Sequence, residues 1–182
     1  MKTLLTASAI ALTLSTSAFA AEPVAPVGGS VHFTGFITDT ACKVNTQDNP
    51  FEESLDLGTF IKTDFAATGD LSQSVPLHLE LTDCPESIKA VTVRVTSVVG
   101  ESVDSAGDYA ITDKADGAKG VAIRLTDDAG ETIAFGKESK EYTVTAGTGA
   151  VDINAQYVAT KAGSEMTAGH ADLDATFSIN YK

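Results

Sequence analysis

Apolar and polar residues alternate with a period of two along most of the chain, in short stretches divided by Gly, Asp, Asn and Ser. This alternation is typical of β-strands with one buried face, and turn-forming runs such as 127–130 and 146–149 separate the strands. No sustained apolar repeat at helical spacing is present, although 64–71 fits a helical turn. The pattern predicts one all-β domain, a sandwich or a barrel. The expected strands are 31–37, 40–44, 54–60, 75–81, 90–98, 109–111, 121–126, 132–135, 142–145, 151–160 and 171–181.

The clearest alternation lies in the last segment, 171–181. Its odd-numbered residues are all apolar and its even-numbered residues are all polar. Since successive side chains of a strand point to opposite faces, this pattern predicts a strand with one face buried along its whole length. The apolar residues are Ala171, Leu173, Ala175, Phe177, Ile179 and Tyr181.

The first apolar segment has a different phase from the second. Val31, Phe33, Gly35 and Ile37 share one face of 31–37, but from Cys42 onward the apolar residues are even-numbered. A shift of one residue turns every side chain to the other face. Two interpretations fit: two extended segments joined near 38–39, the first being a separate arm, or one long strand with a bulge. Gly35 fits either, because a glycine inside a strand marks a bulge or a close approach of another backbone.

The first 20 residues have a composition of their own. Lys2 precedes an uncharged apolar run at 4–14, which is followed by Ala18, Phe19 and Ala20. This is the pattern of a secretory signal peptide cut before residue 21, and the run is too short to cross a bilayer of ~30 Å. No later stretch approaches the ~20 apolar residues of a membrane span. We therefore expect an exported chain without a membrane span, starting with a flexible leader at 21–29 that holds two prolines and a Gly pair.

Two cysteines, Cys42 and Cys84, form an even pair in a chain expected to leave the reducing cytoplasm. The expectation is one disulfide, which would close a loop of about 43 residues and contribute ~4 kcal/mol in the chain-entropy model. Two unpaired buried thiols are the alternative. A metal site is disfavoured because the spacing is unlike C-x2-C and no histidine is near either cysteine.

Charge and motifs exclude several function classes. The formal net charge is −13 and the basic residues are scattered singly, which disfavours nucleic-acid binding. His32, His78 and His170 alternate with apolar neighbours and are expected to face solvent. No G-x-S-x-G, H-E-x-x-H or phosphate-binding Gly-rich loop is present, so we expect no enzyme and no cofactor. Asp127, Asp128 and Glu131 fit a turn better than a weak calcium site, because they lack the EF-hand spacing.

The run 28–44, GGSVHFTGFITDTACKV, resembles the N-terminal signature of the major subunits of type 1 and P pili, in which G-x-V-x-F-x-G-x-[IV] precedes a cysteine. The resemblance continues through 55–58, 79–84, 120–125 and 177–181, in the same order and spacing over nearly the whole chain after the signal peptide. The chain is thus similar to the pilins of the chaperone-usher pilus family.

This resemblance implies an incomplete immunoglobulin-like β-sandwich that lacks its last strand and is completed by donor-strand exchange. A periplasmic pilus chaperone first fills the groove along the final strand, and the N-terminal arm of the next subunit replaces it at the outer-membrane usher. The implied function is that of a structural subunit of an adhesive fimbria on a Gram-negative cell surface, reached through the periplasm. The subunit polymerises head-to-tail with identical subunits and minor tip subunits, with no nucleic acid and no membrane span.

The resemblance also assigns residues. Val31, Phe33, Gly35 and Ile37 would be the donor strand, with Gly35 at a shallow subsite where a side chain would clash. The carboxylate of Lys182 would anchor to basic residues of the chaperone. The acceptor groove and chaperone-binding residues would be Gly169, Ala171, Leu173, Ala175, Phe177, Ile179, Tyr181 and Lys182.

We therefore expect a signal peptide at 1–20, an N-terminal extension at 21–37 and a pilin domain at 38–182. The alternative function is a minor fimbrial adaptor subunit, or a secreted binding module or adhesin of immunoglobulin-like fold. The Gly-Gly leader and the overall length favour the major type of subunit.

Overall fold

The computed structural model describes residues 41–44 and 54–182, which lie in one compact unit. The expected 31–37 segment, the signal peptide and the N-terminal extension lie outside these residues. Two short 3₁₀ helices, η1 (Lys62–Asp64) and η2 (Gly163–Glu165), are the helical elements of the described ranges, and neither is long and apolar enough to cross a membrane. The strands are β1 (Lys43–Val44), β2 (Val75–Thr82), β3 (Ala90–Ser97), β4 (Tyr109–Ala110), β5 (Val121–Asp127), β6 (Tyr142–Thr145), β7 (Thr148–Ala159) and β8 (Ala175–Tyr181).

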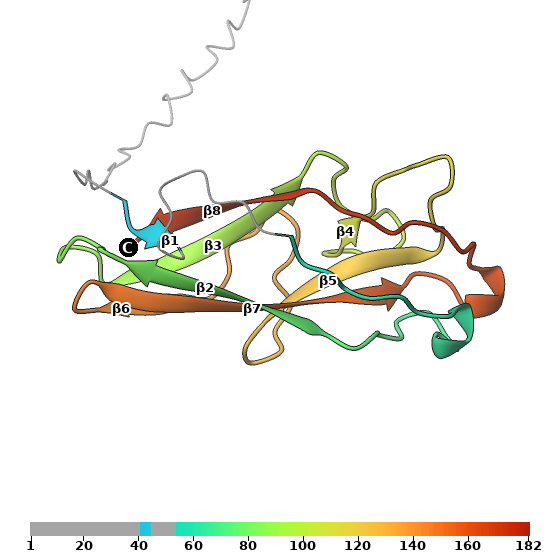
Figure 1. Cartoon of the computed structure of the whole chain (residues 1–182), viewed down its shortest axis with the longest axis horizontal. Helices are drawn as coiled ribbons and strands as arrows, with labels where there is room; N and C mark the ends of the chain where they lie inside the picture. The colour runs from blue at the N-terminus through green and yellow to red at the C-terminus, as the bar shows by residue number, and fades with distance from the viewer. Residues whose placement is uncertain (1–40, 45–53) are drawn as a thin grey trace, which may run out of the picture. The chain divides into compact units, whose positions relative to one another are not determined.

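The strands form two layers joined through β6 (Figure 1). The strand order is β1-β2-β7-β6-β3-β8, and β5 pairs with both β7 and β4. Because β6 pairs with β7 in one layer and with β3 in the other, the sheet folds over on itself. Every pair of named strands is antiparallel. This is the expected immunoglobulin-like sandwich.

The β6–β7 hairpin shows how local sequence sets this topology. Ala146 and Gly147 have φ angles of 51° and 80°, and a two-residue hairpin turn with both φ angles positive matches the twist of its strands. Space is also tight at Gly147, because a Cβ there would lie 3.2 Å from the carbonyl oxygen of Cys84. The turn therefore packs directly against the disulfide-bonded end of the sandwich.

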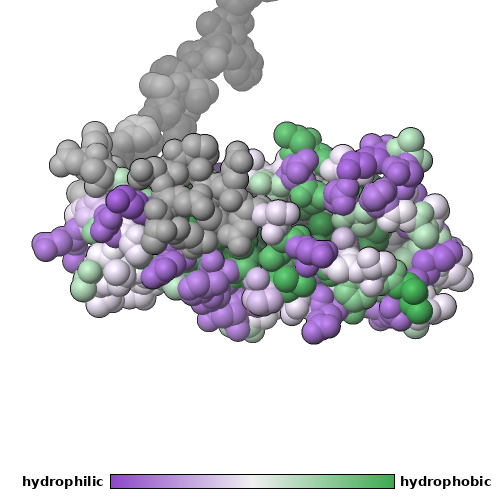
Figure 2. All heavy atoms as spheres, in the orientation of Figure 1, coloured by the Kyte–Doolittle hydropathy of each residue, from purple (hydrophilic) through white to green (hydrophobic). Residues whose placement is uncertain are grey.

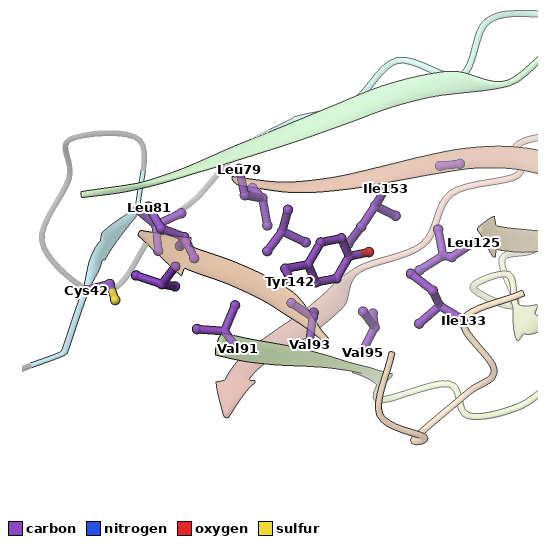
Figure 3. Close-up of a cluster of buried hydrophobic side chains, with 14 of the residues drawn as sticks. Cys42, Leu79, Leu81, Val91, Val93, Val95, Leu125, Ile133, Tyr142 and Ile153 are labelled. Atoms are coloured by element: carbon purple, nitrogen blue, oxygen red, sulfur yellow. The ribbon is translucent and has the colours of Figure 1, made fainter. Parts of the chain in front are cut away.

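The core lies between the two layers. Alternate residues of the facing strands point inward, including Leu79 and Leu81 from β2 and Val91, Val93 and Val95 from β3 (Figure 3). Burying one such side chain contributes about 1.5–3 kcal/mol, so this cluster is the main stabilising feature of the fold.

Two predicted strands are absent, and the strand predicted at 40–44 is shorter than expected. Residues 54–60 form no strand in the structure, and there the side chain of Asp56 accepts a hydrogen bond from the backbone N–H of Gly58, whose φ angle is 86°. In 132–135 only Thr132 forms a bridge, to Thr126, because the next N–H groups bond to separate strands and loops. Of 40–44, only Lys43–Val44 forms a described strand. The helical turn predicted at 64–71 is limited to η1 and the isolated turn after it.

The last segment alternates between apolar and polar sides as predicted, but its apolar side is less buried than predicted. β8 begins at Ala175, four residues later than predicted, and Ala175 itself is exposed. The other apolar residues of the segment are only half-buried. The reason is positional: β8 is the last strand of the order, so one of its edges lies outside the strand ladder of the described residues.

Candidate functional site at the end of the sheet

The candidate site is β8, the terminal strand of the sheet. Its described strand partner is β3, with register pairs that run from Val91 and Tyr181 to Ser97 and Ala175. An edge strand offers a row of N–H and C=O groups to a further strand. In the described residues, a strand from elsewhere would therefore add to the layer of β6, β3 and β8 at this edge.

Burial falls sharply between β3 and β8. Val93 of β3 is fully buried, but Ile179, its register partner on β8, is half-buried. The same contrast holds for Val91 and Tyr181. Figure 2 shows hydrophobic surface on the same face of the molecule, in the area below β8 in Figure 1. The apolar side of β8 thus belongs to the rim of the core and keeps part of its surface in water.

One end of β8 is fastened to β1. The backbone N–H of Cys42 donates a hydrogen bond of 3.2 Å to the hydroxyl of Tyr181, 139 residues away. Cys42 is also joined to Cys84 by the predicted disulfide, which holds β1 beside the end of β2. The two terminal strands of the sheet therefore meet at Tyr181 and Cys42.

The carboxylate of Glu138 lies beside the polar side of β8, near the end of the strand. It accepts hydrogen bonds from Lys182 Nζ (3.2 Å), Asn180 Nδ2 (3.3 Å) and Thr92 Oγ1 (3.2 Å). The hydrogen bonds from Lys182 and Thr92 lower the pKa of Glu138. The backbone oxygen of Lys182 accepts from the N–H of Lys89 at 3.1 Å. The side-chain ammonium and the backbone oxygen of Lys182 are thus both hydrogen-bonded within the chain.

The residues before β8 lie against another part of the chain. The hydroxyl of Tyr157 donates to the carbonyl oxygen of Ala171 (3.0 Å), and the N–H of Thr112 donates to that of Asp172 (2.8 Å). Gly169 lies against 116–118 so closely that a Cβ would be 2.2 Å from the carbonyl oxygen of Asp116. The structure therefore brings Phe177, Ile179 and Tyr181 together with half-buried Leu173 at the core rim, and leaves Gly169 in a separate tight contact.

The predicted donor-strand residues Val31, Phe33, Gly35 and Ile37 lie outside the described residues. Their relation to β8 stays a prediction.

Sequence reasoning missed a buried ion pair. Asp108 is fully buried and accepts two hydrogen bonds from Arg124, from Nε at 2.8 Å and from Nη2 at 2.7 Å. Ser105 Oγ donates to the same carboxylate. Next to it, the hydroxyl of fully buried Tyr109 donates to the carbonyl oxygen of Ile133 at 3.1 Å, and burial raises the pKa of this tyrosine well above its usual range. This group fixes the loop before β4 to β5.

The acidic run at 127–131 forms the predicted turn. Asp127 Oδ1 accepts hydrogen bonds from the N–H groups of Ala129 and Glu131, both at 2.9 Å. Lys140 pairs with Asp127 and Asp128. Over 41–44 and 54–182 no cluster of side chains has the composition of a metal site. The side chains of His78 and His170 are more than half exposed and pair with Asp152 and Asp116, as expected for surface histidines.

Comparison with known proteins agrees with this architecture. The sequence model of the family described as "Fimbrial protein" matches residues 31–182. The type-1 fimbrial protein C chain of Escherichia coli is 34% identical over 178 residues, covering 96% of this chain and 94% of the relative. Among solved structures, a type I fimbria protein of Burkholderia pseudomallei is 28% identical with a TM-score of 0.58, covering 79% of this chain and 91% of that one. The structure of a chaperone-usher pilus gives a TM-score of 0.64 at 22% identity, covering 88% and 99%.

Strand order, open edge and structural neighbours together define the class as the immunoglobulin-like fold of pilins. The family match covers most of the chain and the Escherichia coli relative is alike over nearly its full length. The chain therefore belongs to the fimbrial protein family, which is a family of structural proteins and not of enzymes.

Proposed function

We propose that this chain is a structural subunit of an adhesive surface fimbria, assembled by the chaperone-usher route. Each subunit polymerises head-to-tail by placing its N-terminal arm, with Val31, Phe33, Gly35 and Ile37, along β8 of the neighbouring subunit. The arm completes the sandwich of its neighbour. The contact is heterologous, so it does not close and produces a fibre.

The observation that carries this proposal is the half-burial of the apolar side of β8 at the terminal position of the sheet. Fully burying a large apolar side chain is worth about 1.5–3 kcal/mol, so part of this energy is still to be gained at Ile179 and Tyr181. An arm with apolar residues at every second position matches a strand with apolar residues at every second position. In β-augmentation, backbone hydrogen bonds provide affinity and such alternate side chains fix the register.

The same proposal assigns the remaining parts of the chain. Residues 1–20 direct export into the periplasm, 21–37 carry the arm, and 38–182 form the pilin domain. A periplasmic chaperone binds the apolar side of β8 and the Lys182 carboxylate before an outer-membrane usher admits the next subunit. The fimbria then contains identical subunits and minor tip subunits on the cell surface.

The test is Gly35→Asn, expressed with the chaperone and usher. A side chain at Gly35 would clash in the shallow subsite, so we expect export and chaperone capture to persist while polymer growth stops. The measurement is the ladder of SDS-resistant polymers on a gel of unboiled samples, with the chaperone complex quantified in parallel.

The matched control is Gly29→Asn, which makes the same change in the leader before the arm. It should give the wild-type ladder. A normal ladder from Gly35→Asn would show that the arm is not the polymerising element.

A further inference from the structure

Two surface features lie at opposite ends of β3. Lys89, which lines a cavity, directly precedes the strand, and Val98 directly follows it. An eight-residue strand is roughly 26 Å long, so the two features lie about that far apart.

The first feature is an apolar protrusion formed by residues 98–104, here called the valine loop. Val98 and Val103 are 95% and 97% exposed, and Val99 is partly exposed. Exposed single valines are ordinary, but Val98 and Val103 are both almost fully exposed on one short loop. Hydrogen bonds from Gly100 N to Ser97 Oγ (3.1 Å) and from Ser102 N to the Asp108 carbonyl oxygen (2.8 Å) hold the loop in place. In Figure 1 it follows the arrowhead of β3, and Figure 2 shows hydrophobic surface at that place.

The second feature is a cavity of about 190 Å³ between the β2–β3 turn and the β6–β7 hairpin. A water molecule occupies ~30 Å³ of liquid, so the cavity has room for the side chain of a valine. It lies beside the disulfide, because the N–H of Cys84 donates to the carbonyl oxygen of Gly147. The lining residues are Glu86, Ile88, Lys89, Val144, Ala146 and Gly147.

The proposed polymerisation brings these two features of successive subunits together. Ile37, the last arm residue, is five positions before Cys42, and five extended residues span at most about 18 Å. The cavity end of the donating subunit must therefore lie close to the point where its arm leaves the neighbour. Every pair of named strands is antiparallel, and an arm that continues this pattern leaves β8 at Ala175. Ala175 pairs with Ser97, the residue before Val98.

The geometry points to a second contact between successive copies of this chain, in which the valine loop of one subunit occupies the cavity of the subunit that donates its arm. This inference rests on the proposed function and specifies where the bodies of two subunits touch. Two charged residues line the cavity: Lys89 is opposite in charge to exposed Asp104 of the valine loop and Glu86 has the same charge, so the contact places Asp104 on the Lys89 side. The contact joins unlike surfaces, so it repeats along the fibre in the same way as the arm.

The experiment is site-directed crosslinking in assembled fimbriae. Val103→Cys on the loop is combined with Ser87→Cys, an exposed position between the cavity residues Glu86 and Ile88. The chain has two cysteines, both in the disulfide, so the introduced thiols are the free ones. A short bis-maleimide reagent is used because it joins neighbouring thiols without the strict geometry of a disulfide. The matched control combines Val103→Cys with Ser164→Cys, an exposed serine in η2, away from the cavity.

We expect boiled samples of the first pair to lose most of the monomer band to a covalent ladder, while the control pair stays monomeric. Fimbriae that assemble normally and give no covalent ladder, or that give equal ladders with both pairs, would overturn the inference and leave the arm mechanism intact. Failure of the arm mechanism would appear separately, as SDS-resistant polymers that are insensitive to Gly35→Asn. The crosslinking result is read only in samples that contain donor-strand polymers. The ladder of unboiled samples shows whether those polymers are present.

Discussion

Asp108 shows how a single polar residue supports the fold. Its carboxylate is fully buried and receives two hydrogen bonds from Arg124, so removing its charge leaves a guanidinium without its partner. Hydrogen bonds to charged groups contribute about 1.5–3 kcal/mol each, and Arg124 is partly exposed, which reduces the loss. We expect Asp108→Asn to lower the free energy of unfolding by about 2 kcal/mol in urea titrations. Exposed Asp104→Asn is the control and should change it by less than about 0.5 kcal/mol.

Tyr142 gives the fold a pH dependence on the alkaline side. Burial, and then the nearby carboxylates of Asp127, Asp128 and Asp152, raise its pKa from 10.0 to about 12. Between these values the unfolded chain loses the phenolic proton and the folded chain keeps it, so stability is full below pH 10 and falls as the pH rises through this window. The slope from one such group is at most ~1.4 kcal/mol per pH unit. Urea titrations across this range should show a shallower decline for Tyr142→Phe than for the wild type, and parallel curves would contradict the assignment.

Residues differ in how far the sequence predicts them. The Cys42–Cys84 disulfide follows from an even pair in an exported chain, and the structure confirms it. Asp108 was not predicted because it stands in a polar run, 104–108, that looks like any solvated loop. Its burial depends on Arg124, which is 16 positions away and is brought near by the antiparallel pairing of β4 with β5. No local pattern carries that information.

At the scale of elements, β3 and β8 should respond differently to the same loss of side-chain volume. Val93 is fully buried, so Val93→Ala should destabilise the single subunit by about 2 kcal/mol. Ile179, its register partner, is half-buried, so Ile179→Ala should cost the single subunit less although it removes more atoms. In the fimbria we expect the opposite ranking for the contact between subunits. Ile179→Ala polymers should dissociate at lower guanidinium concentrations than Val93→Ala polymers. Equal effects of Ile179→Ala on subunit and polymer would argue against β8 as the junction.

Period-two alternation predicted most strands within a few residues. The strands predicted well are β2, β3, β5, β6 and β7, and each of them pairs with two or more neighbouring strands in the sheet. It overpredicted 54–60, where an Asp-Leu-Gly turn with positive φ at Gly58 interrupts the extended backbone. It also overestimated the burial of β8. Alternation shows which side of a strand is apolar, but it does not show whether the same chain supplies a neighbour to cover that side.

At the scale of the whole molecule, the disulfide constrains the unfolded chain. Cys42→Ala releases a loop with a sequence separation of 42 and should cost up to ~4 kcal/mol, a large part of the ~5–15 kcal/mol that stabilises a typical domain. We expect a lower yield of chaperone-bound subunit in the periplasm, measured by co-purification. The double variant Cys42→Ala with Cys84→Ala separates loss of the crosslink from reactions of a stray thiol. Unchanged yield in both variants would show that the crosslink is dispensable.

The half-buried side of β8 has a thermodynamic consequence for fibre growth. If a neighbour's arm removes Ile179 and Tyr181 of a chaperone-free subunit from water, the joining step lowers the heat capacity, which is the signature of apolar surface leaving water. A calorimeter would then record the growth of the fibre as the last stage of folding, spread over two chains, and not as the docking of two finished proteins.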